Sequence, residues 1–231
     1  MFELVINNFK MLARKGVKIF ANTSLTSLVD DKNLIKKFYH LIKELKVYRW
    51  RVSRPFPQGN WIENEKQLGI SLERELAISD QIFDLWVKDG CPFDLELGHL
   101  LRYIDGTPQF MNYKKNDYVC DYYRERITIM PNGDVSACPM LIRPPFIIGN
   151  LRRQSLRAIW ENKKMRYYKD LRIRDILDKR CRGCQVFSQC GLGCRACAVL
   201  NRFRYEDIDQ EACTTYLSPK YRELKDKFHQ K

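Results

Sequence analysis

The sequence lacks an apolar run long enough to cross a membrane, since no stretch approaches the roughly 20 residues that a spanning helix needs. It begins with neither an apolar signal core nor a small-residue cleavage site, and it contains no low-complexity stretch or repeat. We therefore expect a soluble, cytoplasmic globular protein with no membrane partner. Histidine is also scarce: His40, His99 and His229 have no ligand-like spacing and are expected to be ordinary helix or tail residues.

Cysteine is missing from the first 90 residues, and nine cysteines then follow. In a reducing compartment such a number favours metal ligation over disulfide bonds. Four of them follow the pattern C-x2-C-x5-C-x3-C: Cys181, Cys184, Cys190 and Cys194. Two cysteines separated by two residues can turn both sulfurs toward one ion or cluster, and thiolates select zinc, copper(I) or iron–sulfur clusters.

Three further cysteines extend this pattern. Cys120 and Cys138 flank Gly133 in the spacing C-x12-G-x4-C, and Cys213 follows Cys194 after eighteen residues. Seven cysteines are too many for one four-coordinate site and suit two sites.

In full, this pattern resembles the SPASM domain of radical S-adenosylmethionine enzymes, which holds two auxiliary [4Fe–4S] clusters. The flanking text agrees as well, at residues 129–135, 148–151, 156–160 and 193–196. The resemblance implies that one cluster, the second, is held by Cys181, Cys184, Cys190 and Cys213. It assigns Cys120, Cys138 and Cys194 to the first cluster.

The fourth ligand of the first cluster is left open by the resemblance. Cys91 is one candidate, and a second possibility is that the iron stays open to a substrate atom. The alternative for Cys91 itself is a thiol merely packed beside Pro92 and Phe93. Cys197 is expected to be a buried spare thiol.

The first half of the chain alternates helical and strand patterns, which is typical of parallel α/β units. We expect helices at 2–14, 33–46 and 72–88, strands at 17–22, 47–54 and 93–97, a loop at 55–71 and a helical turn at 99–104. In the strand at 47–54, Arg49, Arg51 and Ser53 share the polar face. If this sheet belongs to a barrel, these three side chains face its lumen and are candidates for binding a cofactor or substrate.

The second half predicts a β-hairpin, because Asn132-Gly133 lies between two apolar alternations at 126–130 and 135–138. Helices are expected at 154–162 and 164–177.

The fold class expected is therefore α/β: the second half of a partial radical-SAM-type (β/α) barrel at residues 1–112, then a cysteine-rich α+β SPASM domain with a helical tail at 113–231. In this family, a C-x3-C-x2-C loop after the first barrel strand binds the cluster that cleaves S-adenosylmethionine, and no cysteine precedes Cys91. We therefore expect the chain alone to lack that cluster and to bind S-adenosylmethionine only if the missing N-terminal half is supplied.

The net charge of +13 is concentrated between residues 141 and 182, where thirteen Lys or Arg face four acids. A solvated basic surface is favoured there over a nucleic-acid site, since charge alone argues only for association with an acidic partner.

The function that the resemblance implies is the iron–sulfur portion of an oxidoreductase that modifies a peptide, protein or peptide-derived cofactor. The expected partners are that substrate, an electron donor such as a ferredoxin or flavodoxin, and a separate N-terminal half. Two alternatives stay open: a noncatalytic iron–sulfur electron-transfer partner, and a zinc module that binds nucleic acid.

Overall fold

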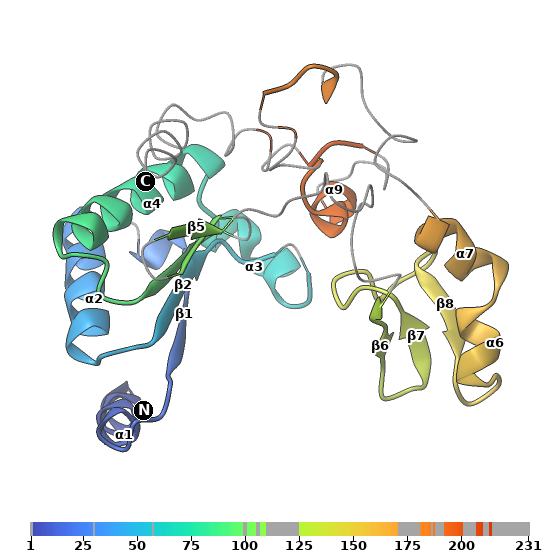
Figure 1. Ribbon diagram of the computed structural model, residues 1–231, viewed down its shortest axis with the longest axis horizontal. Coiled ribbons are helices and arrows are strands. Elements are labelled where there is room, and N and C mark those ends of the chain that lie inside the picture. Colours follow the sequence, from blue (N-terminus) through green and yellow to red (C-terminus); the bar gives the residue numbers. More distant parts are fainter. Residues whose placement is uncertain are drawn as a thin grey trace. The chain divides into compact units, whose positions relative to one another are not determined.

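The computed structural model describes residues 2–29, 31–56, 58–98, 101–104, 107–109, 125–170, 181–185, 187, 192–200, 207–209 and 213. These residues fall into two compact units (Figure 1), the first up to residue 109 and the second from 125 to 213. The predicted domain boundary at 112/113 and the predicted helical tail lie outside the described residues. Within them, no helix combines the length and hydrophobicity that crossing a membrane requires.

The first unit is an α/β unit, a five-stranded sheet with helices. Its elements are α1 (Phe2–Arg14), β1 (Phe20–Ser24), the short 3-10 helix η1 (Ser27–Val29), α2 (Lys32–Glu44), β2 (Arg49–Ser53), α3 (Trp61–Leu68), α4 (Leu72–Lys88), β3 (Asp94–Leu97), β4 (Leu101–Ile104) and β5 (Thr107–Gln109). The strands lie in the order β1-β2-β3-β4-β5. β1, β2 and β3 are parallel, whereas β4 and β5 pair antiparallel. The predicted parallel α/β pattern is therefore confirmed for three strands.

Side-chain caps fix the starts of α2 and α4. The Asp31 carboxylate accepts a hydrogen bond from the Leu34 N–H at 2.8 Å, and the Ser71 hydroxyl accepts one from the Arg74 N–H at 3.2 Å. Such caps satisfy backbone donors that the first helical turn leaves without partners. Helix α4 has the predicted bounds, and α2 begins one residue before the predicted 33.

The first strand begins later than predicted. Gly16 ends α1 with φ +72°, and the Val17 N–H donates to the Leu12 carbonyl at 3.1 Å. Val17 therefore closes the helix, so the predicted strand at 17–22 is wrong at its start and β1 runs from Phe20 to Ser24.

Two other predictions in the first unit are wrong. The predicted loop at 55–71 contains α3, whose Glu, Lys, Gln and Leu residues are good helix formers. The predicted helical turn at 99–104 is strand β4, which pairs with β3 and β5. The dipeptide Asp105-Gly106, typical of hairpin turns, is the sequence signal that favours strands on both sides of it.

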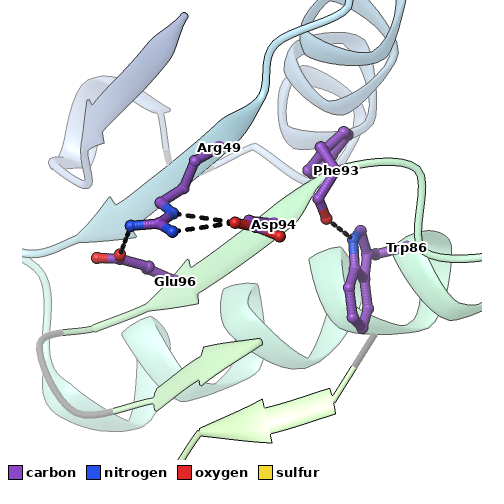
Figure 2. A network of polar contacts seen from close by, with 5 residues as sticks. All are labelled: Arg49, Trp86, Phe93, Asp94 and Glu96. Atoms are coloured by element: carbon purple, nitrogen blue, oxygen red, sulfur yellow. Dashed lines mark hydrogen bonds and ion pairs between the residues drawn. The ribbon is translucent and has the colours of Figure 1, made fainter. Parts of the chain in front are cut away.

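The sheet has one apolar and one polar face. Trp50 and Val52 of β2 are buried in the core that α2 and α4 supply, and Trp86 of α4 lies in the same core. The indole N–H of Trp86 donates to the Phe93 carbonyl at 2.7 Å (Figure 2), which ties α4 to the start of β3. Burial of these large aromatics, together with the aliphatic side chains of the same core, stabilises the unit.

The second unit has a small sheet with helices beside it. Its elements are β6 (Thr128–Ile129), β7 (Asp134–Ser136), β8 (Ile147–Asn150), α6 (Leu156–Trp160), α7 (Lys163–Asp170) and α9 (Arg195–Leu200). The strand order is β6-β7-β8, antiparallel throughout. The predicted hairpin is confirmed. The predicted helix at 154–162 is shorter, because Ser155 caps α6 by accepting from the Ala158 N–H; the predicted end of the next helix, at 177, lies outside the described residues.

The hairpin turn is held by three polar side chains. Gly133 adopts φ +87°, which its lack of a Cβ allows. The amides of Asn132 and Asn150 both donate to the Asp134 carboxylate, at 2.7 and 2.8 Å. The hydrogen bonds from Asn150 and then Asn132 hold the pKa of Asp134 below its usual range. This network fixes the register of β7, which leads directly to Cys138.

Candidate functional site

The first cysteine pair lies on a tight turn. The Cys184 N–H donates to the Cys181 carbonyl at 3.2 Å, and Gly183 between them has φ +79°. Both cysteines are half-buried, and neither is in a disulfide. The C-x2-C segment therefore forms a tight turn of the kind that can bring two thiols toward one metal centre, and its role as a ligand pair remains a prediction.

Cys138 and Cys194 belong to one hydrophobic core. Cys138 follows β7 and is 9% exposed, and Cys194, just before α9, packs partly buried against the same cluster of side chains. The structure thus brings together, in one core, two of the three residues predicted to hold the first cluster.

Asp209 links two predicted ligands that are nineteen positions apart. Its carboxylate accepts a hydrogen bond from the Cys194 N–H at 2.9 Å, and its carbonyl accepts one from the Cys213 N–H at 3.0 Å. Asp209 is fully buried, so these bonds are shielded from water. The sequence analysis missed this residue; an acid four positions before a ligand cysteine was its only signal.

Arg195 shapes the loop in front of Cys194. Its side chain is 3% exposed, and its guanidinium donates to the carbonyls of Leu192 and Asp207. Leu192 has φ +70°, a left-handed conformation that non-glycine residues seldom adopt. Bonding of a buried cation to these carbonyls stabilises that strained turn.

The full ligand sets lie partly outside the described residues, because Cys120 and Cys190 are not among them. Within the described part of the chain, no three Cys, His, Asp or Glu side chains are gathered around a common point. Cys197 is 2% exposed within α9. The donor chemistry of the described thiols fits an iron–sulfur cluster, and the assignment of each ligand remains a prediction.

Cys91 belongs to the first unit. It has φ +57°, packs partly buried against that unit's core, and lines a cavity of about 410 Å³ with Lys18 and Lys46. Burial raises the pKa of its thiol, which favours the neutral form. Its predicted role as a fourth cluster ligand remains a prediction.

The three candidate residues of the polar sheet face differ in their surroundings. Figure 2 shows Arg49 reaching from β2 to two carboxylates of β3: its guanidinium lies 3.0 Å from Asp94 and 3.3 Å from Glu96. Asp94 and Glu96 are 4% and 9% exposed, and the sequence analysis missed both. Arg49 is therefore engaged inside the sheet, where it compensates two buried charges.

Arg51 and Ser53 lie further along the same face, both half-buried. In the register of the sheet, Arg51 stands between Asn22 of β1 and Glu96 of β3. The Nε of Arg51 is buried, and among the described residues it has no hydrogen-bond partner. A buried donor of this kind is unusual and suits an acceptor supplied by a ligand.

Comparison with known proteins identifies part of the chain. Residues 120–185 match SPASM, an iron–sulfur cluster-binding domain. No curated protein is similar enough in sequence to be matched.

Several solved structures share the fold of the whole chain. The protein anSMEcpe with bound AdoMet is similar with a TM-score of 0.66 and 15% identity over 99% of this chain and 61% of that one. Another structure of anSMEcpe, with AdoMet and the Kp18Cys peptide, gives a TM-score of 0.65 at 13% identity, over 100% and 63% of the two chains. Streptococcus suis SuiB bound to S-adenosylmethionine gives 0.60 at 17% identity, over 90% and 48%.

The present chain thus spans about three fifths of the length of anSMEcpe and about half that of SuiB. Residues 120–185 are thus similar to the SPASM iron–sulfur cluster-binding domain, and the expected resemblance to SPASM-containing radical S-adenosylmethionine enzymes is confirmed.

Proposed function

We propose that this chain is the cluster-bearing portion of a radical S-adenosylmethionine/SPASM oxidoreductase that modifies a peptide, a protein or a peptide-derived cofactor. The observation that carries the proposal is the SPASM match at 120–185, which contains Cys120, Cys138, Cys181 and Cys184. A structural relative with a bound peptide supports a peptide substrate.

Two [4Fe–4S] clusters are proposed, with Cys120, Cys138 and Cys194 at the first and Cys181, Cys184, Cys190 and Cys213 at the second. Each cluster would supply one-electron transfer or a grip on the substrate. The chain's own contribution is orientation: the turn at Cys181 sets one thiol pair, and Asp209 fixes the backbone of Cys194 and Cys213.

On the sheet face, Arg51 and Ser53 are proposed to contact the cofactor or substrate, while Arg49 positions the strand through Asp94 and Glu96. The buried Nε of Arg51 is the donor offered to a ligand carboxylate.

Catalysis is proposed to require an N-terminal half-barrel, supplied in trans or by a longer gene product. Among the described strands, β1 pairs only with β2, so its other edge leaves a row of backbone groups for a further strand. Because no cysteine precedes Cys91, no C-x3-C-x2-C loop lies ahead of these strands, and the chain alone is expected not to cleave S-adenosylmethionine.

Metal analysis of anaerobically purified protein tests the cluster assignment. We expect iron and acid-labile sulfide corresponding to about two [4Fe–4S] clusters per chain. Cys184→Ala should lose one cluster, whereas Cys197→Ala, a buried cysteine outside the motif, should keep both. Zinc as the major metal, or equal loss of iron in the two variants, would refute the assignment.

An activity assay tests the need for the N-terminal half. With dithionite and S-adenosylmethionine, the chain alone should form no 5′-deoxyadenosine, and adding the N-terminal half should restore cleavage. Multiple turnovers from the chain alone would show that a catalytic cluster is present.

A further inference from the structure

Helix α7 lies in a basic segment of the chain and itself carries four Lys or Arg and one acid. Between residues 141 and 170 there are eight Lys or Arg and two acids, a local net charge of +6. Seven of the basic side chains are exposed: Arg143, Arg152, Arg153, Arg157, Lys163, Lys164 and Arg166. We call the exposed side of α7, with Lys163, Arg166 and Tyr167, the basic face.

The basic face lies directly over the core that contains Cys138. Met165 of α7 is fully buried in that core, and Tyr168 packs partly buried against it. Helical periodicity then turns Lys163, Arg166 and Tyr167 away from the core, and Tyr167 is 51% exposed.

Aromatic rings connect the basic face to the core. The ring centroids of Tyr167 and Tyr168 are 5.1 Å apart, and those of Tyr168 and Phe146 are 6.0 Å apart. Phe146, which is 6% exposed, belongs to the same buried cluster as Cys138. Ring contacts therefore lead from the exposed Tyr167 into the buried cluster that contains Cys138, a predicted cluster ligand.

Side chains occupy the sheet edge beside this helix. The Lys164 ammonium donates to the Ile147 carbonyl at 2.6 Å, and the Asn162 amide donates to the Ile148 carbonyl at 2.7 Å. These carbonyls of β8 are thus taken, which disfavours an extended peptide that would add a strand there. The surface suits a folded partner that docks by charge.

We propose that the basic face of α7 is the docking surface for an acidic one-electron carrier protein, of the iron–sulfur or flavin class. The inference rests on the proposed function, because it requires a cluster near Cys138. The reduced carrier would give up one electron to the cluster that Cys138 and Cys194 would help to hold. No bond forms or breaks and no proton moves.

Electron-transfer encounters use small interfaces, often below about 1,200 Å², that form and separate quickly. Charge complementarity raises the association rate of such encounters at low ionic strength. Salt at about 0.15 M shortens the screening length to about 8 Å and should weaken the encounter.

The test uses the full chain, the double variant Lys163→Glu/Arg166→Glu, and a matched control, Lys36→Glu/Lys37→Glu, on the exposed side of α2 in the first unit. A plant-type [2Fe–2S] ferredoxin of net negative charge is the binding probe, at low salt and at about 0.15 M. We expect the α7 variant to bind about tenfold more weakly than wild type at low salt, and the control to bind like wild type.

The second readout is the rate of electron exchange between ferredoxin and the cluster-loaded chain, measured by absorbance. The exchange is started in the direction that the reduction potentials favour. Exchange should slow by the same factor in the α7 variant. Reduction by dithionite, which needs no docking surface, should keep the wild-type rate in all three proteins. Unchanged thermal melting would show that charge reversal has not unfolded α7.

Three outcomes overturn the proposal. One is equal ferredoxin binding by the α7 variant and the control, and another is no binding by wild type at low salt. The third is selective loss of binding to a short single-stranded RNA without any ferredoxin binding, which would make α7 a nucleic-acid surface. Zinc in place of iron would contradict the proposed function as well as the docking surface. Iron-loaded protein without selective ferredoxin binding would contradict only the docking surface.

Discussion

The two units of the molecule are stabilised by different means. The first unit buries large aromatic side chains, Trp50, Trp86 and Tyr39, against a five-stranded sheet. The described core of the second unit is made of smaller side chains and includes a thiol, Cys138. An apolar core of the first kind can fold from the chain alone, whereas a small cysteine-rich unit gains much of its stability from the metal it binds.

Removing the metal should produce the largest effect and separate the two units. Metal binding in small cysteine-rich units is worth on the order of 10 kcal/mol. After iron is removed by an anaerobic chelator, hydrogen exchange should show lost amide protection at α6, α7 and α9 and retained protection at α2 and α4. Equal loss in both units would contradict the comparison.

A core mutation in the first unit should destabilise that unit and leave the iron content of the second unit unchanged. Trp86 is fully buried and bonds to the Phe93 carbonyl, so Trp86→Ala should cost about 3–5 kcal/mol of unfolding free energy. Its neighbour Val87 is 46% exposed, and Val87→Ala should cost less than about 1 kcal/mol. Denaturant unfolding measures both, and the iron content of both variants should equal that of wild type. Loss of iron on Trp86→Ala would show that the units are not independent.

Within the second unit, Asp209 should act through hydrogen bonding. Asp209→Ala removes the acceptor of the Cys194 N–H and should cost about 1.5–3 kcal/mol, because that bond is buried and charge-assisted. Asp209→Asn keeps an acceptor of the same shape and should recover most of the stability and iron content. If both variants lost iron equally, the negative charge rather than the bond would be what matters.

The smallest expected effect is a pH dependence in the first unit. Hydrogen bonds from Lys43 and from Tyr39 hold the pKa of Asp89 below its usual range. A lowered folded-state pKa adds stability that is present above about pH 4 and is lost as the pH falls through the folded value.

Thermal melting between neutral pH and pH 3 checks this. Asp89→Asn should remove that part of the acid sensitivity, and the exposed control Glu65→Gln should melt like wild type at every pH. An unchanged acid profile in Asp89→Asn would show that the network does not set it.

The sequence predicts well where local chemistry decides. Helix α4 follows from its apolar period and its Ser71 cap, and the hairpin follows from Asn132-Gly133. The helical turn predicted at 99–104 is wrong although the deciding partners of β4, β3 and β5, are close to it in sequence. The prediction gave too little weight to the local signal Asp105-Gly106.

The candidate site contains residues that local sequence spacing marks and residues that only distant contacts reveal. Cysteine spacing predicts the SPASM domain because chelation by neighbouring thiols is local. Asp209 and the Asp94–Arg49–Glu96 group escape prediction, since their roles arise from contacts between segments that only the folded chain brings together. Acidic residues are common on protein surfaces, so nothing in the sequence marks Asp94, Glu96 and Asp209 as buried.

Deamidation of Asn162 would change the contacts of α7 in the second unit. The oxygen of its amide accepts from the Met165 N–H at 2.7 Å and caps α7, and the nitrogen donates to the Ile148 carbonyl of β8. Hydrolysis of that amide to a carboxylate would keep the cap and set an anion against a carbonyl oxygen. An Asn162→Asp variant should therefore keep α7 helical but loosen it from the sheet, seen as faster hydrogen exchange along β8. Stored protein that gains one negative charge at this position would drift in the same direction.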